Sequence, residues 1–361
     1  MAILAAPAKL RFRDTQIEMA HGAGGKASRR LVEGLFAPLL FGTDREPLGD
    51  AAYVDLAGAR IAITTDSFVV RPLRFPGGSI GELAVNGTVN DLAVSGARAE
   101  ALVAGFVLES GLATPVLEAE VRAMADAARK AGVTVVSGDT KVVEHGKADG
   151  MYITTTGIGR AIPGFELSPR SVRPGDQVIL SGPIGDHGIT VLLARGDLDL
   201  EADLGSDTRS VLPFVEALAD IAGPGVRSGV RSGVRRSGIR WMRDPTRGGL
   251  ATALNELARD CGLSILLRED QIPIRDAVRG ACELLGLDPL HIANEGQFVA
   301  VVSPEFADSA LQALHRTPGG EEARVIGEVR ESPAATVLGV ASYGGTRVID
   351  MLVGDPLPRI C

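Results

Sequence analysis

The sequence predicts a mixed α/β protein with two domains, and three observations support this prediction. The chain has 361 residues, of which 45% are hydrophobic and 23% charged, so it is long enough to bury two cores. Apolar strand patterns alternate with amphipathic helical patterns, which is typical of mixed α/β layers. A segment rich in Pro, Ser and Arg, residues 163–174, separates the two halves.

Each half has its own set of expected elements. In the first half we expect strands and helices in this order: helix 27–40, strand 60–65, helix 80–95, strand 100–108, helix 115–131, strand 133–137 and strand 151–158. Lys-Ala-Gly-Val at 130–133 marks a helix end that runs directly into a strand. The second half continues with strand 176–180, helix 208–221, helix 248–261, strands 263–267 and 297–302, helix 304–314 and strand 323–329.

Charge and hydropathy exclude several classes of function. The net charge of −8 argues against a nucleic-acid partner, because phosphate binding needs a basic face. No apolar run approaches the ~20 residues of a membrane span, and the first residues lack the pattern of a signal peptide. We therefore expect a cytoplasmic protein with no membrane or nucleic-acid partner.

Two of the three cysteines are expected to be buried in the core, and the third is the last residue of the chain. Cys261 and Cys282 lie in apolar helical patterns and are interpreted as core residues, and three cysteines at these spacings form neither a disulfide framework nor a zinc site. Cys361 ends the chain, behind Pro356 and Pro358. It is either a frayed terminus or a nucleophile that carries a group into an active site on a tail able to span roughly 26 Å from residue 353.

A glycine-rich stretch, His21-Gly22-Ala23-Gly24-Gly25-Lys26, precedes the first helix. Backbone N–H groups at a helix N-terminus are typical of phosphate sites. The stretch has neither P-loop nor GxGxxG spacing, so a plain turn remains an equal alternative. Lys26 either pairs with a phosphate or points into water.

Acidic residues lie at the ends of several expected elements. Asp50, Asp66, Asp91 and Asp139 lie beside glycine or where an element ends. If these carboxylates converge, they suit Mg²⁺, which takes oxygen ligands and bridges to phosphates.

The expected helix 80–95 carries a polar row. Glu82, Asn86 and Asn90 are spaced four apart and therefore share one face. A solvated surface is the favoured interpretation of this row, and a ligand-facing row is the alternative.

An arginine-rich repeat interrupts the second half. Gly225–Arg240 contains three near-copies of Gly-Val-Arg-Ser and no acidic residue, which predicts a mobile insertion or, less favoured, a partner-docking loop. Asp244 and Thr246 then precede a glycine-rich helix start, as a cap and an anion site would.

Taken together, these motifs resemble the HypE family of hydrogenase maturation proteins, within the PurM-like (AIR synthetase) superfamily. The matching stretches span nearly the whole chain: His21-Gly-Ala-Gly-Gly, Thr64-Thr-Asp-Ser-Phe, Val85-Asn-Gly-Thr-Val-Asn-Asp-Leu, Ser137-Gly-Asp-Thr-Lys, Asp244-Pro-Thr-Arg-Gly-Gly, Asn294-Glu-Gly and the terminal Pro-Arg-Ile-Cys. The internal motifs indicate the superfamily, and the tail indicates this branch.

For the fold, the resemblance implies a two-domain PurM-like α/β protein. It divides the chain into a glycine-rich segment and helix (1–42), an ATP-binding and dimerisation domain (43–162), a C-terminal α/β domain (170–335) and a flexible tail (336–361). The N-terminal domain is expected to contribute to a β-barrel shared across a homodimer.

For the activity, the resemblance implies ATP-dependent dehydration of an S-carbamoyl group on the C-terminal cysteine to a thiocyanate. The carbamoyltransferase HypF would load the cysteine. The cyano group would then pass to iron on the HypC–HypD scaffold, as a ligand of a nickel–iron hydrogenase.

The resemblance also assigns site residues. Cys361 would carry the substrate, with Lys141 and Glu295 as bases. The expected Mg²⁺ ligands are Asp50, Asp66, Asp91 and Asp244. The expected ATP-binding residues are His21, Gly22, Gly24, Gly25, Lys26, Asn86, Asp139 and Thr140.

Two alternatives stay open. The first is another ATP-dependent enzyme of the same fold, an amidine-forming ligase or a selenide kinase, but these do not need a terminal cysteine. The second is a non-catalytic carrier that presents Cys361 to partners. Arg359 is expected either to favour the Cys361 thiolate against the adjacent α-carboxylate or to dock the tail.

Overall fold

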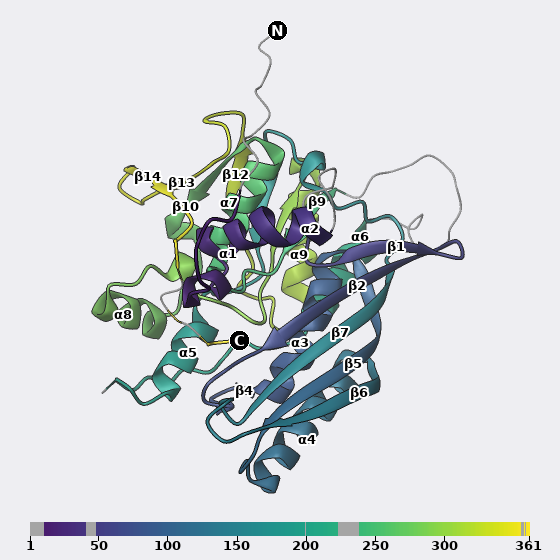
Figure 1. Cartoon of the computed structure of the whole chain (residues 1–361). Helices are drawn as coiled ribbons and strands as arrows, with labels where there is room; N and C mark the ends of the chain where they lie inside the picture. The colour runs from purple at the N-terminus through teal and green to yellow at the C-terminus, as the bar shows by residue number, and fades with distance from the viewer. Residues whose placement is uncertain (1–10, 41–47, 199, 223–237, 355–356, 358) are drawn as a thin grey trace.

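Two β-sheets and their helices form the two α/β domains expected from the sequence. The computed structural model describes residues 11–40, 48–198, 200–222, 238–354, 357 and 359–361. One sheet has five strands and the other has seven, and a two-stranded ribbon lies between β2 and α3 in the chain, formed by β3 (Arg74–Phe75) and β4 (Gly78–Ser79). Figure 1 shows the two sheets side by side, with the C-terminus between them.

The N-terminal sheet has neighbouring strands antiparallel except for β5 and β6, which are parallel. Its order is β1 (Ala52–Leu56), β2 (Ala59–Phe68), β7 (Met151–Ala161), β5 (Ala97–Glu109) and β6 (Thr134–Val143). Helices α3 (Ile80–Val94) and α4 (Thr114–Ala131) cover one face (Figure 1). As the sequence predicted, α4 ends at Gly132, whose φ of 69° permits a left-handed turn into β6.

The other face of this sheet is open in the described part of the chain. Strand alternation turns Thr64, Asp66 and Phe68 towards α3, whereas Val103 and Ile158 face away from it and are exposed. An antiparallel sheet with one uncovered face normally carries polar residues there. The apolar residues on this face are therefore a feature to be explained.

The C-terminal sheet has antiparallel neighbours except for β10 and β13. Its order is β14 (Thr346–Ile349), β13 (Thr336–Val340), β10 (Ser264–Arg268), β12 (Arg324–Arg330), β8 (Gln177–Leu180), β11 (Val299–Val302) and β9 (Ile239–Arg243). Its helices are α5 (Asp186–Ala194), α6 (Leu212–Ile221), α7 (Gly249–Cys261), α8 (Asp276–Leu285) and α9 (Pro304–Arg316).

The two domains share a hydrophobic core. Leu92 of α3 belongs to the same buried cluster as Phe214 of α6 and Phe298 next to β11. Because α3 is apolar on nearly all sides, it packs against its own sheet and against the second domain. The domains therefore hold the residues at their junction in a fixed arrangement.

The last two strands show that the tail starts later in the chain than predicted. β13 and β14 pair within the C-terminal sheet, so residues 336–349 belong to that domain. The tail begins after Ile349, later than the boundary at residue 336 expected from the sequence. The Gly/Ser/Pro-rich turns around these strands concealed the pairing of β13 with β10, which lies about 70 residues earlier.

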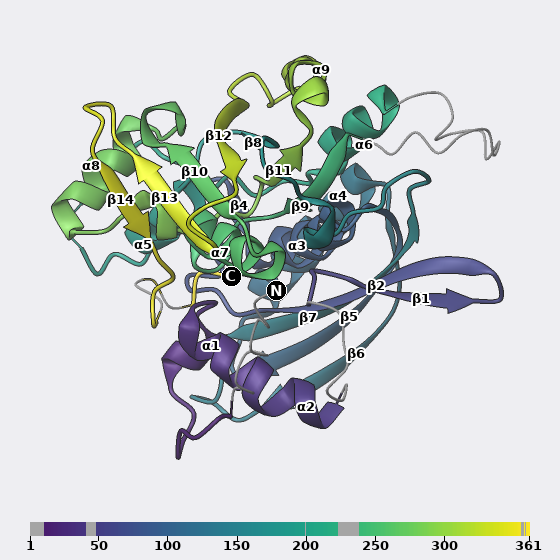
Figure 2. The ribbon, with the colours of Figure 1, turned by 90° about the horizontal axis from the view of Figure 1, so that it is seen from above.

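The described end of the tail is docked, which corrects the expectation of a flexible tail for this state. Ile360 forms a β-bridge with Val70, and the Cys361 carbonyl accepts a hydrogen bond from Val69 N at 2.9 Å. Leu357 and Ile360 are buried in the core cluster that also contains Phe68. Apolar burial and unpaired backbone groups beyond β2 together hold this segment, and Figure 2 shows the C-terminus between the domains.

The first helical region agrees with the expected helix 27–40. It consists of α1 (Lys26–Leu31), a π-helical turn (Val32–Phe36) and α2 (Ala37–Leu40). Most of the arginine-rich repeat, residues 225–237, lies outside the described residues. None of the described helices combines the length and apolar character needed to span a membrane.

Candidate active site

Three carboxylates from different elements converge at the domain junction. Asp50 precedes β1, Asp91 lies on α3 and Asp244 follows β9, and one oxygen of each lies within 4.8 Å of the others. Opposite ligands of Mg²⁺ lie about 4.2 Å apart, because each oxygen is about 2.1 Å from the ion. The spacing of this acidic cluster therefore fits a single divalent cation.

Neighbouring polar groups position the acidic cluster. The Thr64 hydroxyl lies 2.8 Å from Asp91 Oδ2, and Arg243 Nε forms an ion pair with Asp50 Oδ1 at 2.8 Å. Arg243 Nη1 also lies 3.2 Å from the Glu256 carboxylate. The sequence did not single out Thr64 or Arg243 as site residues, although each lies within two residues of a predicted aspartate.

Burial and mutual repulsion raise the pKa values of these acids. Burial is the main cause of the raised pKa of Asp244, to about 8, and the Asp50 charge adds to it. The pKa of Asp91 rises well above its usual range through burial and through Asp244 and Asp50. Burial raises the pKa of Asp50, which Arg243 partly offsets. Negative charge at this site is therefore under-compensated, as expected where a cation binds.

Asp66 lies beside the acidic cluster but is not one of its three carboxylates. It faces α3 from β2, and burial raises its pKa while Arg247 lowers it. Its charge also raises the pKa values of Asp91 and Asp244. Three of the four predicted metal ligands thus meet directly, and Asp66 is their neighbour.

Glu295 belongs to this junction too. It is 3% exposed, and its Oε1 atom is among the buried side-chain oxygens without a hydrogen-bond partner in the described residues. Burial, followed by the charges of Asp66 and Asp244, raises its pKa well above the usual range. An unpaired, buried carboxylate oxygen of this kind is suited to accept a proton or to contact a ligand.

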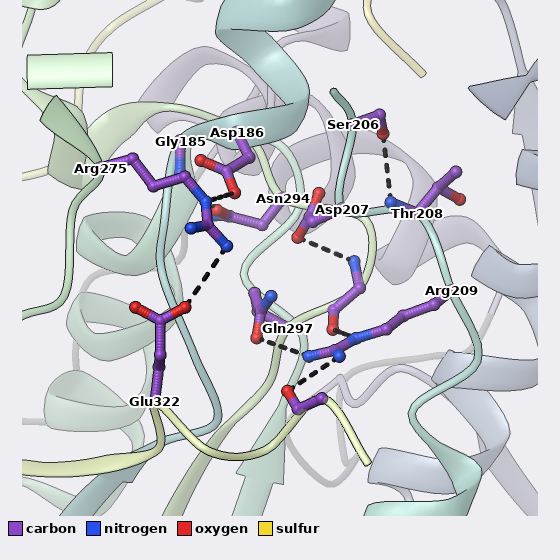
Figure 3. A network of polar contacts seen from close by, with 12 residues as sticks. Gly185, Asp186, Ser206, Asp207, Thr208, Arg209, Arg275, Asn294, Gln297 and Glu322 are labelled. Atoms are coloured by element: carbon purple, nitrogen blue, oxygen red, sulfur yellow. Dashed lines mark hydrogen bonds and ion pairs between the residues drawn. The ribbon is translucent and has the colours of Figure 1, made fainter. Parts of the chain in front are cut away.

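The loop that carries Glu295 is fixed on both sides. Asn294 Oδ1 accepts from Gly185 N at 2.7 Å, and its amide nitrogen donates to the Pro245 carbonyl at 2.9 Å. The Asp207 carboxylate accepts from the backbone N–H of Glu295 and of Gly296, at 3.1 Å each. Figure 3 shows Asp207 and Asn294 near each other. Asp207 has no recognisable motif in the sequence, and only the folded chain reveals its role.

Two of the three residues of the predicted polar row of α3, Asn86 and Asn90, are buried, and Glu82 is half-buried. Asn86 is 8% and Asn90 1% exposed, so the favoured interpretation as a solvated surface is wrong for both. Asn90 accepts from Val211 N at 2.8 Å and donates to the Arg209 carbonyl at 2.9 Å, while Asn86 Nδ2 lies 3.4 Å from Thr208 Oγ1. The second domain covers this face, which local sequence does not reveal.

The glycine-rich loop contacts both the tail and the acidic region. Gly24 lies so close to Arg247 that an added Cβ would be 2.6 Å from the Arg247 carbonyl oxygen, and Arg247 donates to the Gly22 carbonyl at 3.0 Å. The N–H groups of Lys26 and Ala27 donate to the carbonyls of residues 352 and 353. In this state, those two helix N-terminal donors bind the chain itself.

The side chains of this loop are engaged as well. Both ring nitrogens of His21 have partners, the Glu18 backbone N–H at 2.8 Å and Asp14 Oδ2 at 2.8 Å. Lys26 is paired with Asp350, and Gly25 lies against the Leu352 carbonyl. The structure thus places the loop beside the site, whereas the packing of His21 is internal to the loop.

Three predicted residues lie apart from the cluster. Asp139, Thr140 and Lys141 are exposed on the edge strand β6, where Lys141 Nζ pairs with Asp139 Oδ2 at 2.6 Å. The register links Ser67, beside Asp66, through β7 and β5 to Asp139, so three strand spacings, about 14 Å, separate β2 from β6. Asp139 and Lys141 also alternate onto the open face, opposite to α3. Within one chain, Lys141 and Glu295 do not form a pair.

Comparisons with known proteins agree with this architecture. A family model for the N-terminal domain of AIR synthase related proteins matches residues 48–161, and one for their C-terminal domain matches residues 173–339. Carbamoyl dehydratase HypE of Azotobacter vinelandii is 48% identical over 353 residues, which cover 98% of this chain and 99% of that protein. The chain belongs to the HypE family. The family predicted from the motifs is thereby confirmed.

Two solved structures of the HypE family have the same fold. HypE in complex with ATP has a TM-score of 0.77 and 43% identity, covering 95% of this chain and 99% of that one. A HypE–HypF complex contains a chain with a TM-score of 0.80 and 40% identity, covering 89% of this chain and 99% of that one. Membership in the HypE family therefore rests on both sequence and fold.

Proposed function

We propose that this protein is an ATP-dependent carbamoyl dehydratase that converts an S-carbamoyl group on Cys361 into a thiocyanate for hydrogenase maturation. The observation that carries the proposal is the docking of Cys361 against Val69, which follows the strand that bears Asp66. The three residues from Asp66 to Val69 span about 10 Å if extended. The docked Cys361 therefore lies against a residue three positions along the chain from Asp66, the neighbour of the acidic cluster.

The proposed reaction consumes one ATP per carbamoyl group. The carbamoyl oxygen attacks the γ-phosphorus and ADP leaves. The nitrogen then loses its two protons, the C–O bond breaks, phosphate leaves and the C≡N group remains on the cysteine sulfur. Phosphorylation is needed because an amide oxygen is a poor leaving group, and the protein's part is mainly positioning and charge compensation.

The acidic cluster is proposed to bind Mg²⁺ through Asp50, Asp91 and Asp244, with Asp66 as a further oxygen donor. The ion would supply positive charge against the phosphates of ATP. The under-compensated carboxylates and their spacing support this assignment. ATP itself is proposed because a HypE relative was solved with it.

The other nucleotide contacts are proposed for the residues that line this junction. The loop His21–Lys26 lies over Arg247, and Asn86 lies buried on α3 beside Thr208. Lys26 and Ala27 would have to exchange their contacts with the chain for contacts with phosphate. Asp139 and Thr140 are too far along the sheet to join them in the same chain.

Glu295 is proposed as the base that removes protons from the carbamoyl nitrogen. Its buried, unpaired oxygen supports this role, and it becomes a proton acceptor once the repulsion from Asp66 and Asp244 is countered. Lys141 faces the open side of the sheet, so a catalytic role for it requires a second copy of the chain.

A homodimer is proposed on that open face. Val54, Val103 and Ile158 are exposed there by 45%, 38% and 41%. Apolar groups on the uncovered face of a twisted sheet are what a shared β-barrel would bury. HypF is proposed as the loading partner because a HypE relative was solved with it, and the HypC–HypD scaffold as the acceptor of the cyano group.

The mass of the C-terminal peptide tests the proposal. Protein carbamoylated on Cys361 is incubated with Mg²⁺ and ATP, and the peptide is expected to lose the mass of one water. A carrier without catalytic activity would keep the carbamoyl mass unchanged.

A further inference from the structure

The docked tail contacts a buried histidine that the proposed chemistry does not use. His187, in the first turn of α5, is fully buried, and its Nε2 lies 2.6 Å from the Ile360 carbonyl oxygen. Its Nδ1 lies 2.8 Å from Ser206 Oγ. The imidazole therefore links the penultimate residue of the chain to the loop that precedes α6.

The chemistry of the partners defines the tautomer of this histidine. A carbonyl oxygen only accepts, so Nε2 carries the proton and donates to Ile360. Nδ1 is then an acceptor, and the Ser206 hydroxyl donates to it. Ser206 Oγ in turn accepts from Thr208 N at 3.1 Å, as Figure 3 shows. Burial lowers the pKa of His187 to about 4, which keeps the ring neutral near neutral pH.

We propose that His187 is a positioning residue that holds the docked tail in one register, with Cys361 against Val69. This inference rests on the proposed function. Ile360 pairs with Val70 in antiparallel sense, so a slip by one residue would move Cys361 about 3.3 Å and turn its side chain to the opposite face. A fixed partner for one particular carbonyl opposes such a slip, in addition to the burial of Leu357 and Ile360.

The other hydrogen bonds of the tail specify register less strongly. Val69 N and Arg71 N donate to tail carbonyls. After a slip, however, a backbone N–H could donate equally well to the carbonyl of another tail residue. Arg195 Nη2 donates to the Arg359 carbonyl at 2.7 Å from an exposed position. His187, by contrast, donates from a buried side chain. If the tail slipped and its N–H lost the Ile360 carbonyl, the unpaired buried donor would cost about 1–3 kcal/mol.

The neighbouring glycine adds a steric part to the same contact. At Gly188 an added Cβ would lie 2.5 Å from Ile292 and 3.4 Å from Leu357 Cδ1. The lack of a side chain thus lets Leu357 pack against the start of α5. His187 and Gly188 together form the seat of the tail.

The same loop also positions Glu295. Ser206 orients His187, and the next residue, Asp207, accepts from the backbone N–H of Glu295. Residues 206–208 therefore set the docked tail and the proposed base relative to one another.

Two variants of His187 test the proposal. His187→Leu removes the donor, whereas His187→Gln places an amide N–H near the position of Nε2. Each is carbamoylated on Cys361, and conversion is followed in a single turnover with Mg²⁺ and ATP. We expect the Leu variant to convert about tenfold more slowly, the effect of losing one buried hydrogen bond, and the Gln variant to recover most of the rate.

A second measurement does not depend on catalysis. The rate at which N-ethylmaleimide alkylates Cys361, read from the mass of the C-terminal peptide, reports how often the tail leaves its seat. We expect faster alkylation in His187→Leu, an intermediate rate in Ser206→Ala, where the ring loses its orientation, and a nearly unchanged rate in His187→Gln. Thermal unfolding in each variant, with and without ATP, reports folding.

The outcomes separate this inference from the proposed function. A folded His187→Leu variant that converts and alkylates like the wild type overturns the inference. If that variant does not fold, an alkylation rate in Ser206→Ala equal to that of the wild type overturns it instead. A wild-type protein that never converts the carbamoyl group overturns the proposed function, while the alkylation rates still decide the role of His187.

Discussion

Arg243 Nε forms an ion pair with the Asp50 carboxylate at 2.8 Å, and this pair lies at the edge of the acidic cluster. Burial alone would lower the pKa of Arg243, but Asp50 and Glu256 outweigh this effect and keep the guanidinium charged. Arg243 is thus the cation that already compensates part of the negative charge where the elements of the two domains meet.

Replacing Arg243 should destabilise the metal-free protein. Arg243→Met leaves Asp50 and Glu256 without their cation, and we expect a loss of about 3 kcal/mol in the free energy of unfolding, measured with urea. Glu256→Gln is the matched control and should change stability by less than about 1 kcal/mol, because Glu256 is more exposed than Asp50. Equal losses in both variants would mean that Arg243 acts through packing and not through charge.

The metal-free protein should become less stable as pH rises, and Mg²⁺ should reduce this loss of stability. The pKa of Asp244 is about 8 in the folded protein, against an ordinary value of 3.8 for an aspartate, so the folded state binds more protons between these values. The free energy of unfolding of the metal-free protein should therefore fall as pH rises through this range. Mg²⁺ binds the deprotonated carboxylates, so it should reduce this fall and release protons on binding.

Urea midpoints at several pH values, with and without Mg²⁺, check this expectation. Asp244→Asn is the control, since it removes the titrating group and should flatten the metal-free profile. A metal-free profile that rises through the same range would contradict the account of the acidic cluster.

Asp91→Asn should separate stability from activity. The amide keeps the size of the side chain and its contact with Thr64, but it removes one charge from the cluster. We expect a more stable metal-free protein, together with loss of the conversion of the carbamoyl group and normal loading of Cys361. Retained conversion in Asp91→Asn would mean that the metal site is elsewhere.

Arg359 should act by docking the tail. Its guanidinium pairs with Asp149 at 2.7 Å, which favours the docking alternative over direct assistance to the Cys361 thiolate. Because this pair is partly exposed to solvent, Arg359→Ala and Asp149→Ala should each change stability by about 1 kcal/mol or less and accelerate alkylation of Cys361 to a similar extent. A shift in the thiol titration in Arg359→Ala alone would instead support the thiolate role.

The open sheet face should carry the dimer contact. Ile158→Glu places a charge at that face, and we expect sedimentation to show a monomer that remains folded, because Ile158 is already exposed. Val116→Glu, on the far side of α4, is the matched control and should leave the association unchanged. If Ile158→Glu associates like the wild type, the two copies meet on another surface.

How much of this the sequence could predict depends on the range of the interactions. The elements and the two domains followed from local patterns, because hydrophobic periodicity and element ends are local properties. Local patterns also marked Asp50 and Asp91, whereas Asp244 was assigned to the metal site only through the family resemblance. The burial of Asn86 and Asn90 did not, since it depends on a second domain more than 100 residues away. The pairing of β13 with β10 and the seat of the tail at His187 are likewise products of distant packing.

Lys141 shows the same limit in another way. The family motif grouped it with Glu295, but strand alternation and register place Lys141 on the open face of the N-terminal sheet. Glu295 instead contacts α3, on the other side of that sheet, where its carbonyl accepts from Asn90. Local sequence does not say which face of the sheet a given side chain points to, because this depends on the register in which the strand pairs. A contact between Lys141 and Glu295 would therefore require a second copy of the chain.

The mass of the Cys361 peptide after loading and incubation with Mg²⁺ and ATP tests the central claim most directly. The account predicts loss of one water from the carbamoylated peptide, one phosphate released per peptide converted, and no conversion in Asp91→Asn. A carbamoylated peptide whose mass is unchanged while ATP remains intact would contradict it.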